Sequence, residues 1–227
     1  MPGRLGGFVL AAATALVILG GSILPFLTPV YIRIEQDRSG VERLTGWDPG
    51  LVYEVTTSIV GDLLFGGDFD VAVGDSPALN DREQAHMRDV RGVFQGFFAI
   101  VVVSIVLVGV SFRRARSGDA RAAAWRAVGS GARGLAIGLA VVGAFAVFAF
   151  DAAFEVFHRL FFNAGSYTFD ARTDRLVQLF PEQFWSETAI AVGAVAIVVA
   201  ALTAWRAGRL AGAVEPAARL SASTARS

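Results

Sequence analysis

The chain has 227 residues, of which 54% are hydrophobic and only 18% are charged. Its formal net charge is zero and it contains no cysteine, which excludes disulfides, a thiol nucleophile and thiolate metal ligands. The apolar residues are gathered in four long blocks rather than spread along the chain. This composition argues against a soluble globular domain and indicates a membrane protein.

Each apolar block is long enough to cross a bilayer. A hydrocarbon core of about 30 Å needs roughly 20 helical residues, and a helix at this length satisfies its own backbone groups in lipid. The sequence therefore predicts an all-α membrane protein, a single membrane domain (1–227) built as a bundle of four transmembrane helices. The spans are expected at about 7–31, 92–112, 134–157 and 187–205.

The first block also has an alternative interpretation as a signal peptide, because Arg4 supplies a charged start. The apolar run is too long for that interpretation, and no clear small-residue cleavage site follows it. Pro25 and Pro29 are better explained as residues that kink or end a retained helix.

Charge is strongly segregated between the connecting segments. Residues 33–91 carry six Arg against twelve Asp and Glu, whereas 113–133 carries six Arg against one Asp, and the tail after Trp205 has four Arg. Arginine accumulates on the cytoplasmic side of membrane proteins. We therefore expect both termini and the 113–133 loop to be cytoplasmic, and the long acidic segment to be extracytoplasmic.

The long acidic segment contains patterned residues, so we expect a small extracytoplasmic cap over 33–86. Asp48 followed by Pro49 is typical of a helix start, and Gly66 with Gly67 would end that helix. Between them apolar residues recur every four positions, as in an amphipathic helix: Leu51, Val55, Ile59 and Leu63. Residues 68–73 alternate like a short strand. An unstructured acidic loop is the alternative.

A second outer segment, 160–186, follows the third span and is expected to lie at the membrane interface. Leu176, Leu179 and Phe180 would occupy one side of an interfacial helix. Phe184 and Trp185 suit the headgroup region.

The two histidines of the chain both fall near the outer ends of spans. His86 precedes the second apolar block by about two helical turns, with Asp89 one turn later. Asp151, Glu155 and His158 follow the third block at i, i+4 and i+7, which places them on one helical face. Polar groups at membrane depth usually face a bundle interior or a cavity. We therefore predict a paired-histidine site, whereas simple solvation of these helix ends is the competing interpretation.

Three strings of the chain resemble a known family. They are EQAHMRDV (83–90), FDAAFEVFHRLFFN (150–163) and TDRLVQLFPEQFW (173–185). In order and spacing they resemble the lipoprotein intramolecular transacylase family of four-span bacterial membrane proteins. The resemblance covers residues 50–205 and places His86 and His158 at the two functional histidine positions of the family. Tyr167 stands where a Trp is expected.

The resemblance implies an acyltransferase of the bacterial cell membrane with no cofactor and no metal. It implies transfer of the sn-2 acyl chain from the S-diacylglyceryl group of a lipoprotein to the α-amine of its N-terminal cysteine, giving the lyso form. Histidine can accept and return the protons involved, and the roles of His86 and His158 remain open. Asp89 and Asp151 are the candidates for orienting the imidazoles. The expected partners are a diacylated lipoprotein and membrane lipid.

Two other functions compete with this one. His86 and His158 with Asp89, Asp151 or Glu155 would suit a metal-dependent membrane hydrolase, although no compact metal motif is present. A non-catalytic scaffold would use the acidic cap to bind a partner. Nucleic acid is not expected as a partner, because the basic 113–133 loop is not interleaved with aromatic residues in the pattern of nucleic-acid-binding segments.

Overall fold

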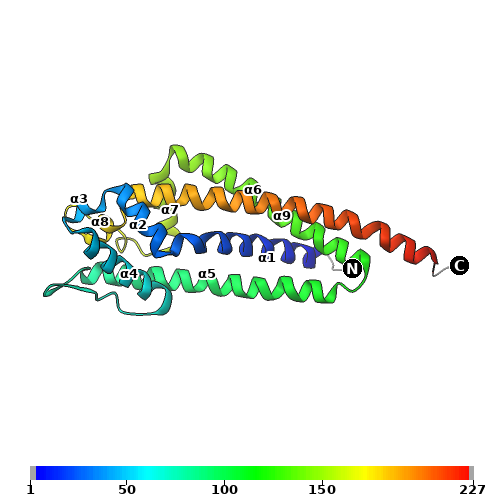
Figure 1. Cartoon of the computed structure of the whole chain (residues 1–227), viewed down its shortest axis with the longest axis horizontal. Helices are drawn as coiled ribbons and strands as arrows, with labels where there is room; N and C mark the ends of the chain where they lie inside the picture. The colour runs from blue at the N-terminus through cyan, green and yellow to red at the C-terminus, as the bar shows by residue number, and fades with distance from the viewer. Residues whose placement is uncertain (1–3, 225–227) are drawn as a thin grey trace. The chain divides into compact units, whose positions relative to one another are not determined.

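The computed structural model describes residues 4–224, which are mostly helical (Figure 1). Among these residues, four helical segments are long and apolar enough to cross a membrane: Arg4–Leu27, Asp81–Arg114, Gly118–Ala146 and Glu182–Val214. The expected all-α membrane protein with four transmembrane helices is confirmed.

Most elements follow one another along the chain with short connections, whereas residues 162–174 form a longer one. The helices are α1 (Arg4–Ile23), the 3-10 helix η1 (Leu24–Leu27), α2 (Pro29–Ser39), α3 (Val41–Thr45), α4 (Pro49–Phe65), α5 (Asp81–Arg114), α6 (Gly118–Phe148), α7 (Phe150–Phe161), α8 (Arg175–Leu179) and α9 (Glu182–Thr224). A two-residue antiparallel pair, β1 (Ala72–Val73) and β2 (Ser76–Pro77), joins α4 to α5.

The described residues divide into two compact units. The first contains 4–22, 98–144 and 193–224, and the second contains 23–97 and 145–192. The long helices α5 and α9 therefore contribute one end to each unit.

The first unit is held together by small residues at its helix contacts. Ala124 of α6 and Ala207 of α9 are buried in one cluster with Leu10 of α1. A Cβ atom on Gly131 of α6 would overlap the main-chain carbonyl of Ala11 in α1. Lipid tails supply no hydrophobic drive between transmembrane helices, so close approach through small residues provides much of their attraction.

The second unit has its own hydrophobic core around α4. Asp48 caps this helix by accepting hydrogen bonds from the amides of Gly50 and Leu51 at 3.0 and 3.1 Å, and the helix ends before Gly66. The structure has this helix at the place where the sequence predicts one. Of its apolar stripe Val55, Ile59 and Leu63 are buried and Leu51 is half-buried, and this stripe packs in one cluster with fully buried residues that follow it in sequence: Phe69, Leu79 and Leu179.

The segment after α4 differs from the expected strand over 68–73. The backbone has positive φ at Gly66 (96°) and at Phe69 (59°), so only Ala72 and Val73 are extended and paired. Phe69 holds this unfavourable conformation because its ring is fully buried and its amide donates to Asp62 Oδ2 at 2.9 Å. Burial of the Phe69 ring stabilises this bent backbone more than the alternating pattern of 68–73 would stabilise a strand.

Two expected spans are interrupted in the structure. The 7–31 stretch is not one helix, because α1 ends at Ile23 and a new helix begins at Pro29, capped by Thr28. The 134–157 stretch breaks at Ala149 (φ −146°, ψ 51°), where α6 gives way to α7. The reason is visible in the residue pattern: 134–148 is apolar on all sides, whereas α7 is amphipathic.

Candidate active site

His86 lies in the second turn of α5 and is 6% exposed. The capped first turn of α5 extends the helix well before the apolar stretch, so the ring reaches the interior of the second unit. Phe162 and Phe169 contact it with ring centroids at 4.9 and 5.4 Å. Its Nδ1 atom is buried and has no hydrogen-bond partner among the described residues. A buried polar atom without a partner costs about 1–3 kcal/mol, which marks Nδ1 as an atom suited to bind a ligand.

His158 lies in the last turn of α7 and is 8% exposed. Its Nδ1 lies 2.8 Å from the main-chain oxygen of Phe154, one turn earlier. Because a carbonyl oxygen can only accept a hydrogen bond, Nδ1 must carry the proton, and Nε2 of the neutral ring then holds the lone pair. The rings of Phe154 and Tyr167 cover His158 at 4.1 and 5.0 Å.

The structure brings the two histidines together. Their ring centroids are 6.1 Å apart and their planes differ by only 24°. The pair is enclosed by aromatic side chains contributed by α7 and by the segment that follows it: Phe154, Phe157, Phe162, Tyr167 and Phe169.

The two aspartates expected to orient the imidazoles are exposed. Among the hydrogen bonds of the described residues, none joins Asp89 to His86 or Asp151 to His158. His158 takes its orientation from a main-chain carbonyl, and sequence patterns do not reveal such a partner.

Tyr167 connects the loop after α7 back to α7 itself. Its hydroxyl donates to Glu155 Oε1 at 3.3 Å, and Arg159 Nε donates to the same oxygen at 2.7 Å. The tyrosine ring therefore lies over His158 while its hydroxyl remains at the polar side of α7. A Trp at this position would offer an N–H donor in place of the phenol.

Sequence inspection missed a buried polar network beside His86. Glu83 is 1% exposed and accepts hydrogen bonds from the amides of Asn80 and Leu176 at 2.7 and 2.6 Å. Asp174 is also buried and pairs with Arg82 at 2.9 Å. The signal was present in the string NDRE (80–83), because Asn followed three residues later by Glu resembles a capping box.

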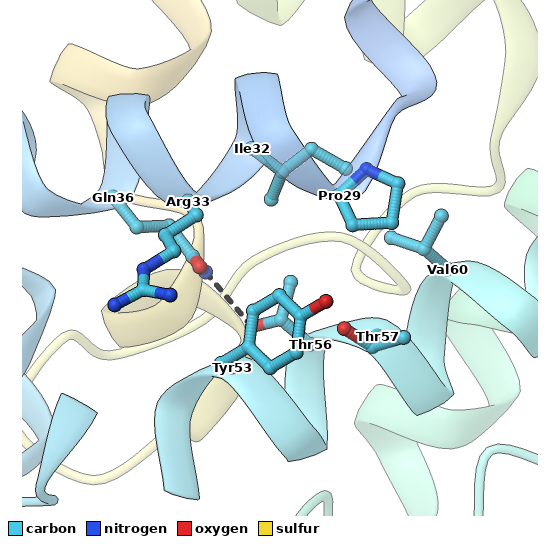
Figure 2. A pocket seen from close by; sticks show the side chains of 8 residues that line it. All are labelled: Pro29, Ile32, Arg33, Gln36, Tyr53, Thr56, Thr57 and Val60. Carbon is cyan, nitrogen blue, oxygen red and sulfur yellow. Dashed lines mark hydrogen bonds between the residues drawn. The ribbon is translucent and has the colours of Figure 1, made fainter. Parts of the chain in front are cut away.

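Neither histidine lines the pocket between α2 and α4. Figure 2 shows that pocket, in which Arg33 and Gln36 of α2 face Tyr53, Thr56 and Thr57 of α4. Gln36 Nε2 donates to Thr56 Oγ1 at 2.9 Å, and the guanidinium of Arg33 lies 5.7 Å from the Tyr53 ring. These contacts hold the two helices together at a place apart from the histidine pair. Within residues 4–224, no three His, Asp or Glu side chains form a group that could hold a metal ion.

A family model and solved structures match this chain. Residues 8–185 match the model of the family described as lipoprotein intramolecular transacylase Lit. The solved structure of the membrane integral lipoprotein intramolecular transacylase Lit from Bacillus cereus is similar, with a TM-score of 0.75 and 16% identity over 91% of this chain and 94% of that one. A variant of the same Bacillus cereus protein, with one histidine replaced by arginine, gives 0.69 and 15% over 96% and 94%. At these identities the likeness shows a shared fold. A comparison with curated proteins gave no match.

Proposed function

Because the chain belongs to the lipoprotein intramolecular transacylase family and is an acyltransferase, we propose that it moves the sn-2 acyl chain of a diacylglyceryl lipoprotein to the α-amine of the N-terminal cysteine. The product is the N-acyl, S-monoacylglyceryl form. The observation that carries the proposal is the pair of buried, nearly parallel imidazoles of His86 and His158, 6.1 Å apart. Two such groups suit a reaction that removes one proton and returns another.

His158 is the proposed general base. An α-amine has a pKa near 8 and is mostly protonated at neutral pH, so it first releases one proton to solvent to become the neutral nucleophile. The nitrogen must lose a second proton once it has attacked. The hydrogen bond from His158 Nδ1 to the Phe154 carbonyl supports this role, because it leaves the lone pair on Nε2. After the amine nitrogen attacks the ester carbonyl carbon, Nε2 of His158 takes the proton that this nitrogen must lose.

His86 is proposed to act on the oxygen atoms of the ester, whereas His158 acts on the amine. Its unpartnered Nδ1 supports a role in binding the developing oxyanion or the glycerol oxygen. When the tetrahedral intermediate collapses, the bond between the carbonyl carbon and the sn-2 oxygen breaks. That oxygen receives the proton through the imidazole pair, so an ester and an amine become an amide and an alcohol.

No covalent nucleophile is needed in this scheme. The amine and the ester belong to one molecule, so an aromatic enclosure that holds the substrate folded supplies a high effective molarity. The enclosure also excludes water, which would otherwise compete with the amine for the ester carbon. The substrate reaches the site from the bilayer, and membrane lipid is the medium of both substrate and product.

Mass balance of the product tests the proposal. When the protein is expressed in cells that lack their own N-acylation, an abundant lipoprotein should keep the intact mass of its N-terminal lipopeptide. Its fragmentation should change, because one fatty chain becomes an amide on cysteine while the glycerol keeps one ester. Tandem mass spectrometry of the lipopeptide measures both quantities.

The competing functions give other results in the same measurement. A hydrolase would release a fatty acid, so the lipopeptide would lose one acyl group and gain the elements of water. A scaffold would leave both mass and fragmentation unchanged. Either result, or a constant mass without an N-acyl cysteine fragment, would contradict the proposed transfer.

We also propose that the histidine pair faces the extracytoplasmic side and that both termini are cytoplasmic. The segregation of arginine supports this orientation. Reporter fusions at Gly74 and Gly165, which lie in the second unit, should report an extracytoplasmic location. Fusions at Gly118 and at the C-terminus should report a cytoplasmic one. If Gly74 and Gly118 report the same side, the proposed orientation is wrong.

A further inference from the structure

We propose that Glu83 and Asp174 are positioning residues, which fix the turn of α5 that carries His86 against the segment 169–176. This inference deepens the proposed function, on which its activity measurement rests. The two carboxylates touch neither imidazole. They act through the backbone of the turn and through Phe169, which packs on the His86 ring at 5.4 Å.

Glu83 caps two helices at once. Its Oε2 accepts the amide of Asn80 at 2.7 Å, while Asn80 Oδ1 accepts the amide of Glu83 at 3.0 Å, which completes a reciprocal capping box at the start of α5. Its Oε1 accepts the amide of Leu176 at 2.6 Å, in the first turn of α8. Since Glu83 is 1% exposed, both hydrogen bonds are shielded from water. Each carboxylate oxygen is needed as the acceptor for one main-chain amide.

Asp174 makes a second connection between the same two segments. Its Oδ1 accepts from Asn80 Nδ2 at 3.1 Å and its Oδ2 accepts from Arg82 Nη2 at 2.9 Å. The same Oδ2 accepts the amide of Asp170 at 2.7 Å. The first turn of α5 is therefore joined to 170–176 by side chains running in both directions.

His86 lies one helical turn after Glu83 and on the same face of α5. Phe169, immediately before Asp170, contacts both the ring of His86 and the guanidinium of Arg82, which is 5.1 Å from the Phe169 ring. A shift of the 170–176 segment would therefore move Phe169 away from the imidazole. Displacements of about 1 Å at reacting groups can cost on the order of 100-fold in rate.

The test is the variant Glu83→Gln, which keeps the size of the side chain but presents an N–H₂ group to one of the two amides. We expect acyl transfer to fall by roughly 10- to 100-fold. We also expect diethyl pyrocarbonate to modify His86 several times faster, with little change at His158, as measured by peptide mass spectrometry on the purified, intact protein. Asp81→Asn is the matched control, because it removes an exposed carboxylate from the same turn and should change neither quantity.

The second variant, Asp174→Asn, should show the same selective increase in the modification rate of His86. It replaces Glu83→Gln in the experiment if that variant does not fold. Equal acceleration at both histidines, or a loss of activity with no change at His86, would overturn the positioning role in favour of a purely structural one. Unchanged activity and reactivity in both variants would also overturn it. The reactivity measurement needs no lipoprotein, so it tests positioning even if the wild-type protein shows no acyl transfer, a result that would instead contradict the proposed function.

Discussion

Replacing either His86 or His158 by alanine is expected to abolish acyl transfer while leaving the protein inserted and folded. General acid–base groups contribute about 10²–10⁴-fold each, and both are needed if one removes the proton that the other returns. The lipopeptide assay measures the loss. Because the two imidazoles would act as one unit, the double variant should be little worse than either single variant.

The matched control is Gln84→Ala, which truncates a half-buried side chain in the same part of α5. Gln84 Nε2 only donates to the Leu79 carbonyl at 2.9 Å, so its loss should leave transfer nearly intact. Substantial activity in His86→Ala or His158→Ala would remove the proton-transfer role and favour the scaffold function.

Gly131→Ala is expected to destabilise the first unit strongly although it adds only one methyl group. A Cβ at Gly131 would overlap the carbonyl of Ala11 and lie 2.8 Å from the Ala11 Cα atom. The neighbour is backbone, which cannot rotate away, so α1 and α6 must separate. Overpacking of this kind costs typically about 1–3 kcal/mol. Thermal unfolding in detergent or bicelles, compared with wild type, measures it.

Gly134→Ala is the control for helix propensity, because nothing lies within 4 Å of a Cβ at that position of the same helix. It should be neutral or stabilising by up to about 1 kcal/mol, as Ala is the better helix former. Equal stability of the two variants would mean that α1 and α6 do not approach as closely at Gly131 as described.

The sequence allowed the membrane class to be predicted because blocks of apolar residues signal spans regardless of their packing. It also allowed α4 to be predicted from Asp48, Pro49 and Gly66, since capping is local chemistry. The approach of His86 to His158 was inferred from topology, because both rings fall at span ends that should lie on one side of the membrane.

Interactions formed in three dimensions could not be predicted in the same way. The change from an apolar run to an amphipathic helix is visible in the sequence, but the exact position of the break, Ala149, is not, because no proline or glycine marks it. The orienting roles given to Asp89 and Asp151 rested on helical spacing alone, yet neither carboxylate bonds to an imidazole. Phe69 adopts a left-handed conformation for the sake of its buried ring, and burial of that kind depends on residues distant in sequence.

The acceptor that orients His158 has a genetic consequence. It is the main-chain oxygen of Phe154, and every amino acid at position 154 supplies that oxygen. Point substitutions can therefore remove the ring of His158 or its aromatic neighbours, but none can delete the atom that holds its proton on Nδ1. As long as α7 remains helical, every substitution at position 154 keeps this hydrogen-bond acceptor. An alanine variant at that position therefore reports the loss of the Phe154 ring and not the contribution of the main-chain oxygen.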